Sequence, residues 1–157
     1  MFKVNDYVIY GAHGVSQIID IIEDEQKYYL IRPINSTLSI KTPVDNEKVI
    51  IRGIMSKKDV ITLIDSINDI DTIWIQDMKQ RSLKFKSLVK AGDCKDLIRI
   101  IKTLNIKQDE GVSNRKKITL SDKEILEQAQ RRLNEEFAYA LEISEEEVED
   151  FILEHIQ

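Results

Sequence analysis

The side chains with the most chemical potential in this sequence are the basic ones in its middle. Residues 79–117 hold twelve Lys and Arg against four Asp and Glu, although the whole chain of 157 residues has a formal net charge of −5. A dense block of positive charge attracts a polyanion such as nucleic acid, whatever the net charge of the chain. The other interpretation is a solvated helix face, and the sequence leaves both open.

Residues that would support catalysis or metal binding are few. The five glycines form none of the spacings that cradle phosphates, and the single cysteine, Cys94, has no basic or histidine partner beside it in the sequence. Two histidines, His13 and His155, leave little for a metal site. We therefore expect no enzyme, no cofactor, no metal and no small-molecule ligand, and we expect Cys94 to be a small buried residue.

The sequence also bears on where the protein acts. No run approaches the ~18 apolar residues of a membrane helix, and the first residues lack the basic and apolar regions of a signal peptide. A single cysteine fits a reducing compartment. We expect a cytoplasmic protein with no membrane partner.

Apolar residues in the first third of the chain alternate or cluster in short runs that are rich in Val, Ile and Tyr. Turn-forming residues separate these runs, and none of the runs has the 3.6-residue period of a helix. Short strands at this spacing predict a small, strongly bent antiparallel sheet or barrel. The predicted strands are residues 7–10, 15–22, 28–31, 38–42 and 49–51.

The pattern changes to a helical period near residue 56. Ser56 followed by Asp59 is typical of a helix start, and Asp71 or Thr72 is expected to cap a second helix. That helix is expected to end at Gly92, after which Asp93 caps a third helix. The apolar stripe of the second helix is expected to contain Trp74, Met78, Phe85, Leu88 and Val89.

The last third combines a polar segment with two further helix starts. The segment 107–117 contains no apolar residue except Val112 and predicts a mobile basic loop. Capping-box patterns at Ser121–Glu124 and Ser144–Glu147 then open a long helix and a final acidic helix. The expected fold class is α+β, with an all-β domain at residues 1–55 and an all-α domain of about five helices at residues 56–157.

The opening segment resembles the start of a known protein family. Residues 2–15, FKVNDYVIYGAHGV, resemble the F-x-x-G-D-x-V-V-Y-P-x-H-G-x start of the CarD/CdnL proteins, which are bacterial regulators that bind RNA polymerase. The same module resembles the polymerase-interacting domain of transcription-repair coupling factors, but no helicase motif follows it here. The resemblance continues through residues 28–31 and 38–43, resumes at residues 79–81 and 90–93, and runs through residues 121–141.

This resemblance implies a role for the first domain. In the family, a Tudor-like N-terminal domain docks on the β subunit of RNA polymerase, partly by pairing a sheet edge with it. Such pairing draws its affinity from main-chain hydrogen bonds, so few side chains are diagnostic. The family's basic contact residue in the strand before Pro43 corresponds to Lys41. The alternative is that Lys41 is an ordinary exposed lysine.

The resemblance also implies that the helical domain contacts promoter DNA at the upstream edge of the transcription bubble. There the family inserts a tryptophan against the minor groove, and wedges of this kind oppose the reannealing of unstacked strands. Counted back from Gly92, the family's tryptophan position falls on Met78, whereas Trp74 lies four residues earlier. Three interpretations stay open: Trp74 is the wedge, Met78 is the wedge, or neither is and Trp74 belongs to the core.

The expected function follows from the resemblance and the charge distribution together. We expect a transcription regulator that binds the polymerase β subunit and stabilises the promoter open complex. The alternatives are a protein-interaction adaptor without DNA contact and an autonomous DNA-binding repressor. The expected phosphate-binding residues are Lys79, Arg81, Lys84 and Lys86, with Lys90 and the run Arg115–Lys117 as weaker candidates.

Overall fold

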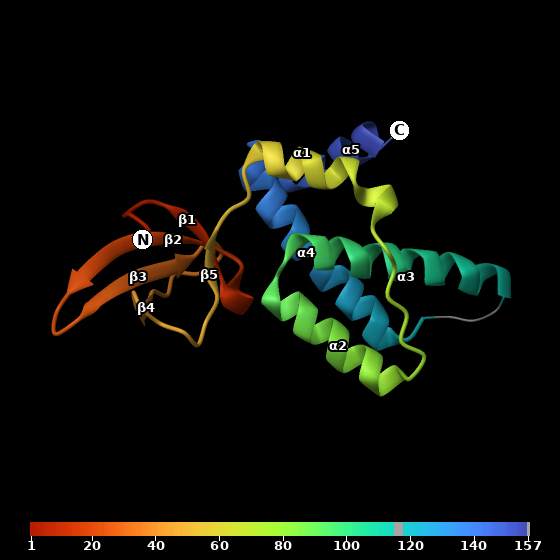
Figure 1. Cartoon of the computed structure of the whole chain (residues 1–157), viewed down its shortest axis with the longest axis horizontal. Helices are drawn as coiled ribbons and strands as arrows, with labels where there is room; N and C mark the ends of the chain where they lie inside the picture. The colour runs from red at the N-terminus through yellow and green to blue at the C-terminus, as the bar shows by residue number, and fades with distance from the viewer. Residues whose placement is uncertain (115–117, 157) are drawn as a thin grey trace. The chain divides into compact units, whose positions relative to one another are not determined.

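The computed structural model describes residues 1–114 and 118–156 (Figure 1). The chain divides into two compact units, Met1–Met55 and Ser56–Gln157. An antiparallel five-stranded sheet forms the first unit, and five α-helices form the second. The expected α+β fold class is confirmed.

The first unit is a single sheet with the strand order β4-β3-β2-β1-β5, so β4 and β5 are its edges. The five predicted strands exist in the predicted order, although the last two begin two residues late. The reason at β5 is a turn in which the Asn46 side chain accepts hydrogen bonds from the backbone of Lys48 and Val49 at 2.9 and 2.8 Å. The strands are β1 (Tyr7–Tyr10), β2 (Val15–Glu23), β3 (Lys27–Pro33), β4 (Ile40–Pro43) and β5 (Ile51–Gly53). A short 3-10 helix, η1 (Gly11–His13), joins β1 to β2.

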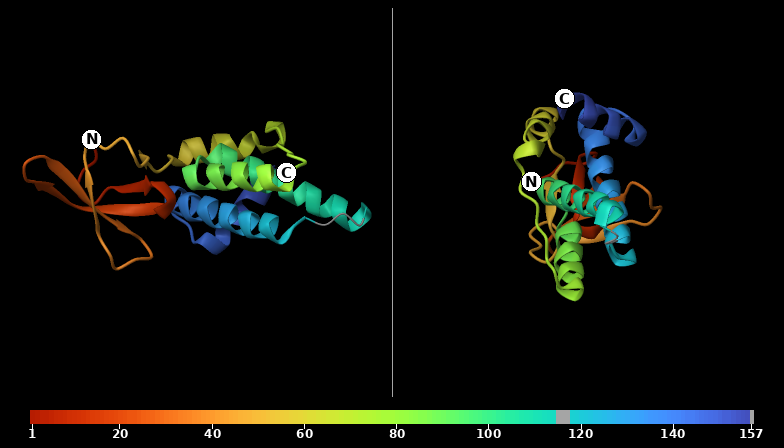
Figure 2. Two further views of the ribbon diagram at one scale, coloured as in Figure 1. Left: turned by 90° about the horizontal axis from the view of Figure 1, so that it is seen from below. Right: turned by 90° about the vertical axis from the view of Figure 1, so that its right-hand side faces the viewer.

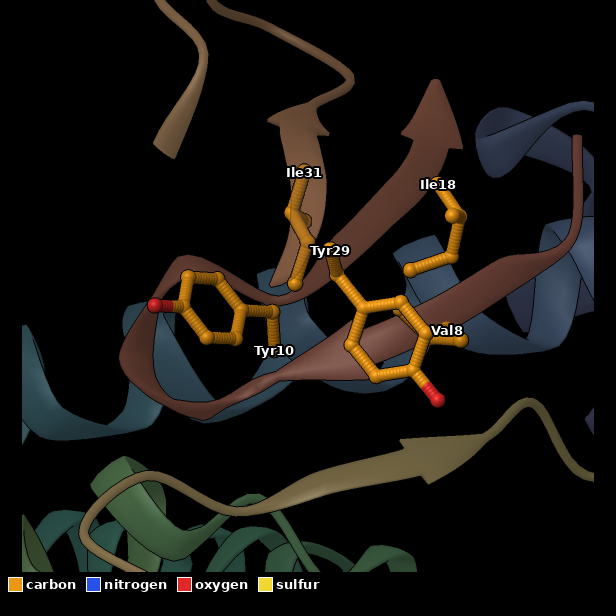
Figure 3. Close-up of a cluster of buried hydrophobic side chains, with 5 residues drawn as sticks. All are labelled: Val8, Tyr10, Ile18, Tyr29 and Ile31. Carbon is orange, nitrogen blue, oxygen red and sulfur yellow. The ribbon is translucent and has the colours of Figure 1, made fainter. Parts of the chain in front are cut away.

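The core of this unit depends on strong bending of the sheet. Side chains from β1, β2 and β3 point toward one another in Figure 3 and form a buried cluster of Val8, Tyr10, Ile18, Tyr29 and Ile31. The Tyr10 hydroxyl on β1 lies 2.6 Å from the Thr42 hydroxyl on β4. These strands are three steps apart in the sheet, roughly 14 Å if it were flat. The hydrogen bond therefore requires the curved, barrel-like sheet that the sequence predicts.

The second unit is built around one central helix. Figures 1 and 2 show α4 (Leu120–Leu141) running through the helical unit, where it packs against the other four helices. Its buried side includes Leu126, Ala129, Leu133 and Phe137, which recur at helical spacing. The other helices are α1 (Lys57–Asp65), α2 (Met78–Ala91), α3 (Cys94–Asn114) and α5 (Glu145–Ile156), and a 3-10 turn, η2 (Ile67–Asp69), follows α1.

Three helix ends fall where the sequence places them. The Ser56 side chain accepts a hydrogen bond from the Asp59 backbone at the start of α1. Gly92 ends α2 in the left-handed conformation with φ 76°. The Asp93 carboxylate accepts a hydrogen bond from the Asp96 backbone at 3.2 Å and so caps α3. These local signals are self-contained, which explains why the sequence reveals them.

The start of α2 was predicted wrongly. The helix begins at Met78, where Asp77 caps it by accepting a hydrogen bond from the Gln80 backbone at 2.9 Å. Residues 71–77 are not helical, so Trp74 precedes the helix and does not belong to its apolar stripe. Instead, the backbone of Ile73 donates to the Thr103 hydroxyl of α3 at 3.0 Å, and this tertiary contact competes with helix formation.

Two further predictions need correction. Residues 107–114 belong to α3 and are not a loop; Lys107 pairs with Glu110 at 3.2 Å, an i,i+3 contact that supports the helix there. Residues 115–117, which complete the predicted loop, lie outside the described residues. The long helix starts with a capping box of Thr119 and Asp122, two residues earlier than the predicted Ser121–Glu124 box. Before α5, the Glu147 carboxylate accepts from the Ser144 hydroxyl at 2.9 Å, close to the predicted arrangement.

Gly11 offers a test of the first unit, because its φ of +48° disfavours any side chain. A Cβ atom there would also lie 2.7 Å from a Val49 methyl group. We expect Gly11→Ala to lower the free energy of unfolding of this unit by about 1–2 kcal/mol. Scanning calorimetry of the full chain measures this, with Gly53→Ala as the control because nothing lies within 4 Å of a Cβ there. Equal effects of the two variants would contradict the argument.

Candidate nucleic-acid and polymerase interface

The polymerase-binding candidate Lys41 lies on an edge strand. It is exposed on β4, which pairs with β3 alone among the strands of the sheet. Its ammonium group lies 4.3 Å from the centre of the Tyr28 ring on β3. An edge strand offers unpaired backbone donors and acceptors to a further strand. The first unit thus combines an open β edge with a basic side chain that an aromatic ring holds in place.

Three of the candidate lysines form one face of α2. Lys79, Lys86 and Lys90 are all exposed, and their spacing of seven and four residues places them on the same side of the helix. We call these three residues the lysine face. Leu83 lies between them and is 72% exposed, and this exposure was not predicted from the sequence. Lys84 is also exposed but lies about 140° around the helix axis from Lys79.

Arg81 differs from these lysines because it is buried. Only 3% of Arg81 is exposed. Its guanidinium group makes a two-point ion pair with Asp122 of α4, with Nε 3.0 Å from Oδ1 and Nη2 2.9 Å from Oδ2. The remaining nitrogen, Nη1, donates to the Ile75 carbonyl at 2.8 Å. Because all three nitrogens are bonded within the protein, we assign Arg81 a structural role and leave it out of the phosphate-binding set.

Asp122, the partner of Arg81, was not predicted from the sequence. Its carboxylate also accepts a hydrogen bond from the Thr119 backbone at 3.0 Å, which closes the capping box of α4. Burial of the carboxyl group raises its pKa, but the hydrogen bonds from Arg81 and Thr119 and the Arg81 charge hold the pKa below the ordinary 3.8. The T-x-x-D spacing of residues 119–122 is a capping signal that could have revealed this residue.

The two candidate wedges have different environments. Trp74 is partly buried; its indole nitrogen donates to the Gln76 side chain at 3.1 Å, and its ring centre lies 4.2 Å from the Arg81 guanidinium carbon. Lys107 of α3 contacts the same ring, with its ammonium group 4.9 Å from the centre. Met78, in contrast, is 59% exposed at the first position of α2.

The sequence predicts Trp74 and Met78 on one apolar stripe of a helix, but the structure does not place them on one stripe. The Arg81 side chain projects from α2 about 160° around the helix axis from Lys79. Trp74 stacks on Arg81 and therefore lies on the side of α2 away from the lysine face. The structure brings Trp74 together with Arg81, but it separates both from Lys79, Lys86 and Lys90. The weaker candidates Arg115–Lys117 lie outside the described residues.

Other kinds of site are not visible among the described residues. Among the described residues, no three His, Cys, Asp or Glu side chains gather in a way that could hold a metal ion. Cys94 is buried, and its thiol donates to the buried Glu136 carboxylate at 3.2 Å. No described helix is both long enough and apolar enough to cross a membrane.

The lowered pKa of Asp122 predicts how stability depends on pH. A carboxyl group whose pKa is lower in the folded state stabilises that state above its unfolded pKa of 3.8, and this contribution disappears as the pH falls through the folded pKa. We expect Asp122→Asn to cost about 3 kcal/mol or more at pH 7, because it leaves Arg81 buried without its charge partner.

The measurement is urea unfolding of the full chain between pH 7 and pH 2, followed by far-ultraviolet circular dichroism. Wild type should lose stability relative to Asp122→Asn as the pH falls below about 4. A constant difference between the two proteins over this range would show that Asp122 does not titrate with folding.

The comparison with known families covers both units. The CarD-like/TRCF RID domain matches residues 2–55, and the CarD C-terminal domain matches residues 62–153. No individual curated protein matches the chain significantly. The order of the two matched domains is that of the sheet and the helical unit described above. The chain therefore belongs to the CarD/CdnL family of RNA polymerase-interacting transcription factors.

Proposed function

We propose that this protein binds the β subunit of RNA polymerase through its first unit and stabilises the promoter open complex through contacts of α2 with DNA. The observation that carries the proposal is the match of both units to the family's two domains. The DNA contact is expected at the upstream edge of the transcription bubble. The protein would act without a cofactor and in the cytoplasm, as a regulator of initiation and not as an enzyme.

The open edge of β4 supports the polymerase contact. Strand addition there would use backbone hydrogen bonds, and Lys41 would add one charged contact at the rim of the interface. The Tyr28 ring limits the positions that the lysine side chain explores, because it attracts the ammonium group. A positioned charge loses less entropy on binding than a free one.

The exposure of Met78 supports it as the wedge. Methionine is one of the apolar side chains that proteins insert between base steps. Met78 is accessible because it is 59% exposed, whereas Trp74 would have to leave Arg81, Lys107 and Gln76 before it could enter a groove. Met78 also occupies the family's tryptophan position. We therefore assign the wedge to Met78 and a supporting role to Trp74.

The lysine face supports weak, sequence-independent contacts with phosphates. Lys79, Lys86 and Lys90 offer ammonium groups along one side of a single helix, and Lys84 offers another about 140° around its axis. Each contact would release condensed counterions from the DNA. Binding to polymerase would keep α2 near the promoter, so these contacts need little affinity of their own. This explains how a chain with a net charge of −5 can act on DNA.

The wedge is tested by the lifetime of open complexes challenged with competitor DNA. Wild type should lengthen the lifetime, and Met78→Ala should shorten it about tenfold relative to wild type, a fraction of the few kcal/mol that unstacking a base step costs. Leu120→Ala is the matched control, because Leu120 is 73% exposed at the start of α4. Trp74→Phe keeps an aromatic ring for Arg81 and should retain most of the effect.

The same assay separates the wedge from the polymerase contact. Lys41→Glu should raise the protein concentration needed for half of the effect but leave the lifetime at saturation unchanged, because tethering only supplies effective concentration. Met78→Ala should lower the saturated lifetime instead.

Loss of the effect in Trp74→Phe alone would assign the wedge to Trp74. No lengthening by wild type, despite polymerase binding, would leave an adaptor; DNA protection without polymerase would indicate a repressor.

The lysine face is tested by the salt dependence of binding to polymerase–promoter complexes. We expect Lys79→Gln, Lys86→Gln and Lys90→Gln each to weaken binding at every promoter and to lower the slope of log affinity against log salt by about one. Lys58→Gln is the control, because Lys58 is exposed on α1. Weakening that is confined to one promoter sequence would contradict a phosphate contact.

A further inference from the structure

One carboxylate holds the first turns of two helices. Asp122 closes the capping box at the start of α4 and forms the two-point ion pair with Arg81 in the first turn of α2. The Ser82 and Ser121 hydroxyls lie 3.1 Å apart beside this pair. The starts of α2 and α4, which are 41 residues apart at Arg81 and Asp122, are therefore fixed to each other.

Arg81 extends this connection to the chain that leads into α2. Its Nη1 donates to the Ile75 carbonyl at 2.8 Å and also lies 3.4 Å from the Gln76 carbonyl. Its guanidinium plane lies over the Trp74 ring. One buried side chain thus contacts residues 74–76, directly before the cap at Asp77 and the exposed Met78.

Helix α3 also contacts the segment that leads into α2, mainly at its upstream part. The Ile73 backbone donates to Thr103, and the Lys107 ammonium group lies over Trp74. Further upstream, the Lys102 ammonium group donates to the carbonyls of Ile67, Asn68 and Ile70 at 3.0, 3.2 and 2.8 Å. Figure 1 shows this yellow-green segment running from η2 to the start of α2. Contacts with α2 and α3 therefore replace the internal hydrogen bonds that residues 71–77 lack.

We propose that Arg81, held by Asp122, is a positioning residue that fixes Trp74 and the start of α2, and thereby fixes where Met78 meets the DNA. The inference rests on the proposed function, because it presumes that Met78 contacts the promoter. A non-helical segment loses conformational entropy for each residue that is fixed. Arg81 makes this loss part of folding, so the segment is already ordered when the DNA arrives.

A general stabilising role does not account for this geometry. A buried ion pair contributes little net stability compared with apolar packing of the same volume. Arg81 instead uses its planar group for three directed tasks: binding a carboxylate at two points, binding backbone carbonyls and stacking on an indole ring. Lysine keeps the charge but lacks the fork and the plane, so Arg81→Lys removes these tasks and keeps a cation beside Asp122.

The chain contains a matched control at the other end of α2. Arg132 of α4 also binds α2 through its guanidinium group, which donates to the Val89 and Lys90 carbonyls at 2.6 and 2.9 Å. Arg132→Lys therefore makes the same chemical change to an α2–α4 contact, but at the C-terminal end of α2. A loss of general stability would appear in both variants, whereas a loss of positioning would appear only in Arg81→Lys.

Trp74 reports its own position, because it is the single tryptophan of the chain. We expect Arg81→Lys to shift its emission to longer wavelength and to increase its quenching by acrylamide, a neutral quencher that the lysines do not attract. The open-complex lifetime at saturating protein should fall roughly fivefold, which corresponds to ~1 kcal/mol, the net value of one hydrogen bond. Arg132→Lys should change neither readout, and both variants are compared at temperatures where circular dichroism shows them folded.

The outcomes separate the inference from the proposed function. Unchanged Trp74 emission and quenching in folded Arg81→Lys would overturn the positioning role, whatever the lifetime. Altered emission with an unaltered lifetime would overturn the link to Met78, if wild type lengthens the lifetime. If wild type does not lengthen it, the proposed function fails, and the emission alone decides on the position of Trp74. Should Arg81→Lys not fold, Thr103→Val removes the Ile73 contact instead and should give the same changes.

Discussion

The helical unit depends on the buried contact between Arg81 and Asp122. Removing either charge would leave the other buried without a partner, which is far more costly than an exposed pair would be. The contact also sets the geometry of three segments at once: the first turn of α2, the first turn of α4 and the chain that carries Trp74. Since α4 packs against every other helix, loss of this contact would disturb the packing of the whole helical unit.

The first unit meets a different constraint, because a five-stranded sheet must enclose its own core. Strong bending brings Tyr10 to Thr42 across the sheet and buries the tyrosines with Val8 and Ile31. The same bending does not close the sheet by strand pairing, so β4 keeps an open edge. An exposed edge is a hazard in an isolated domain. Open edges of this kind can accept a strand from another protein.

Charge in this protein acts in three separate ways. Lysines at the surface of α2 are exposed, so water and salt screen their charges. Arg81 is shielded from solvent, so its charge serves directional bonds inside the fold. The first turn of α5 contains three glutamates, which suits the positive end of a helix dipole. Net charge describes none of these uses, because burial and direction decide what each charge does.

The amino-acid sequence alone was enough to predict the β-then-α order, the number and order of the strands, the helix caps at Ser56, Gly92 and Asp93, and the family. Those features depend on local periodicity and on short spacings that a single segment contains. Packing between helices, in contrast, sets the start of α2 at Met78, the continuation of α3 past Lys107 and the stacking of Trp74 on Arg81. An arginine among exposed lysines has the same local sequence signal whether or not an aspartate 41 residues away faces it. Its burial is a property of packing between helices, and no local pattern encodes it.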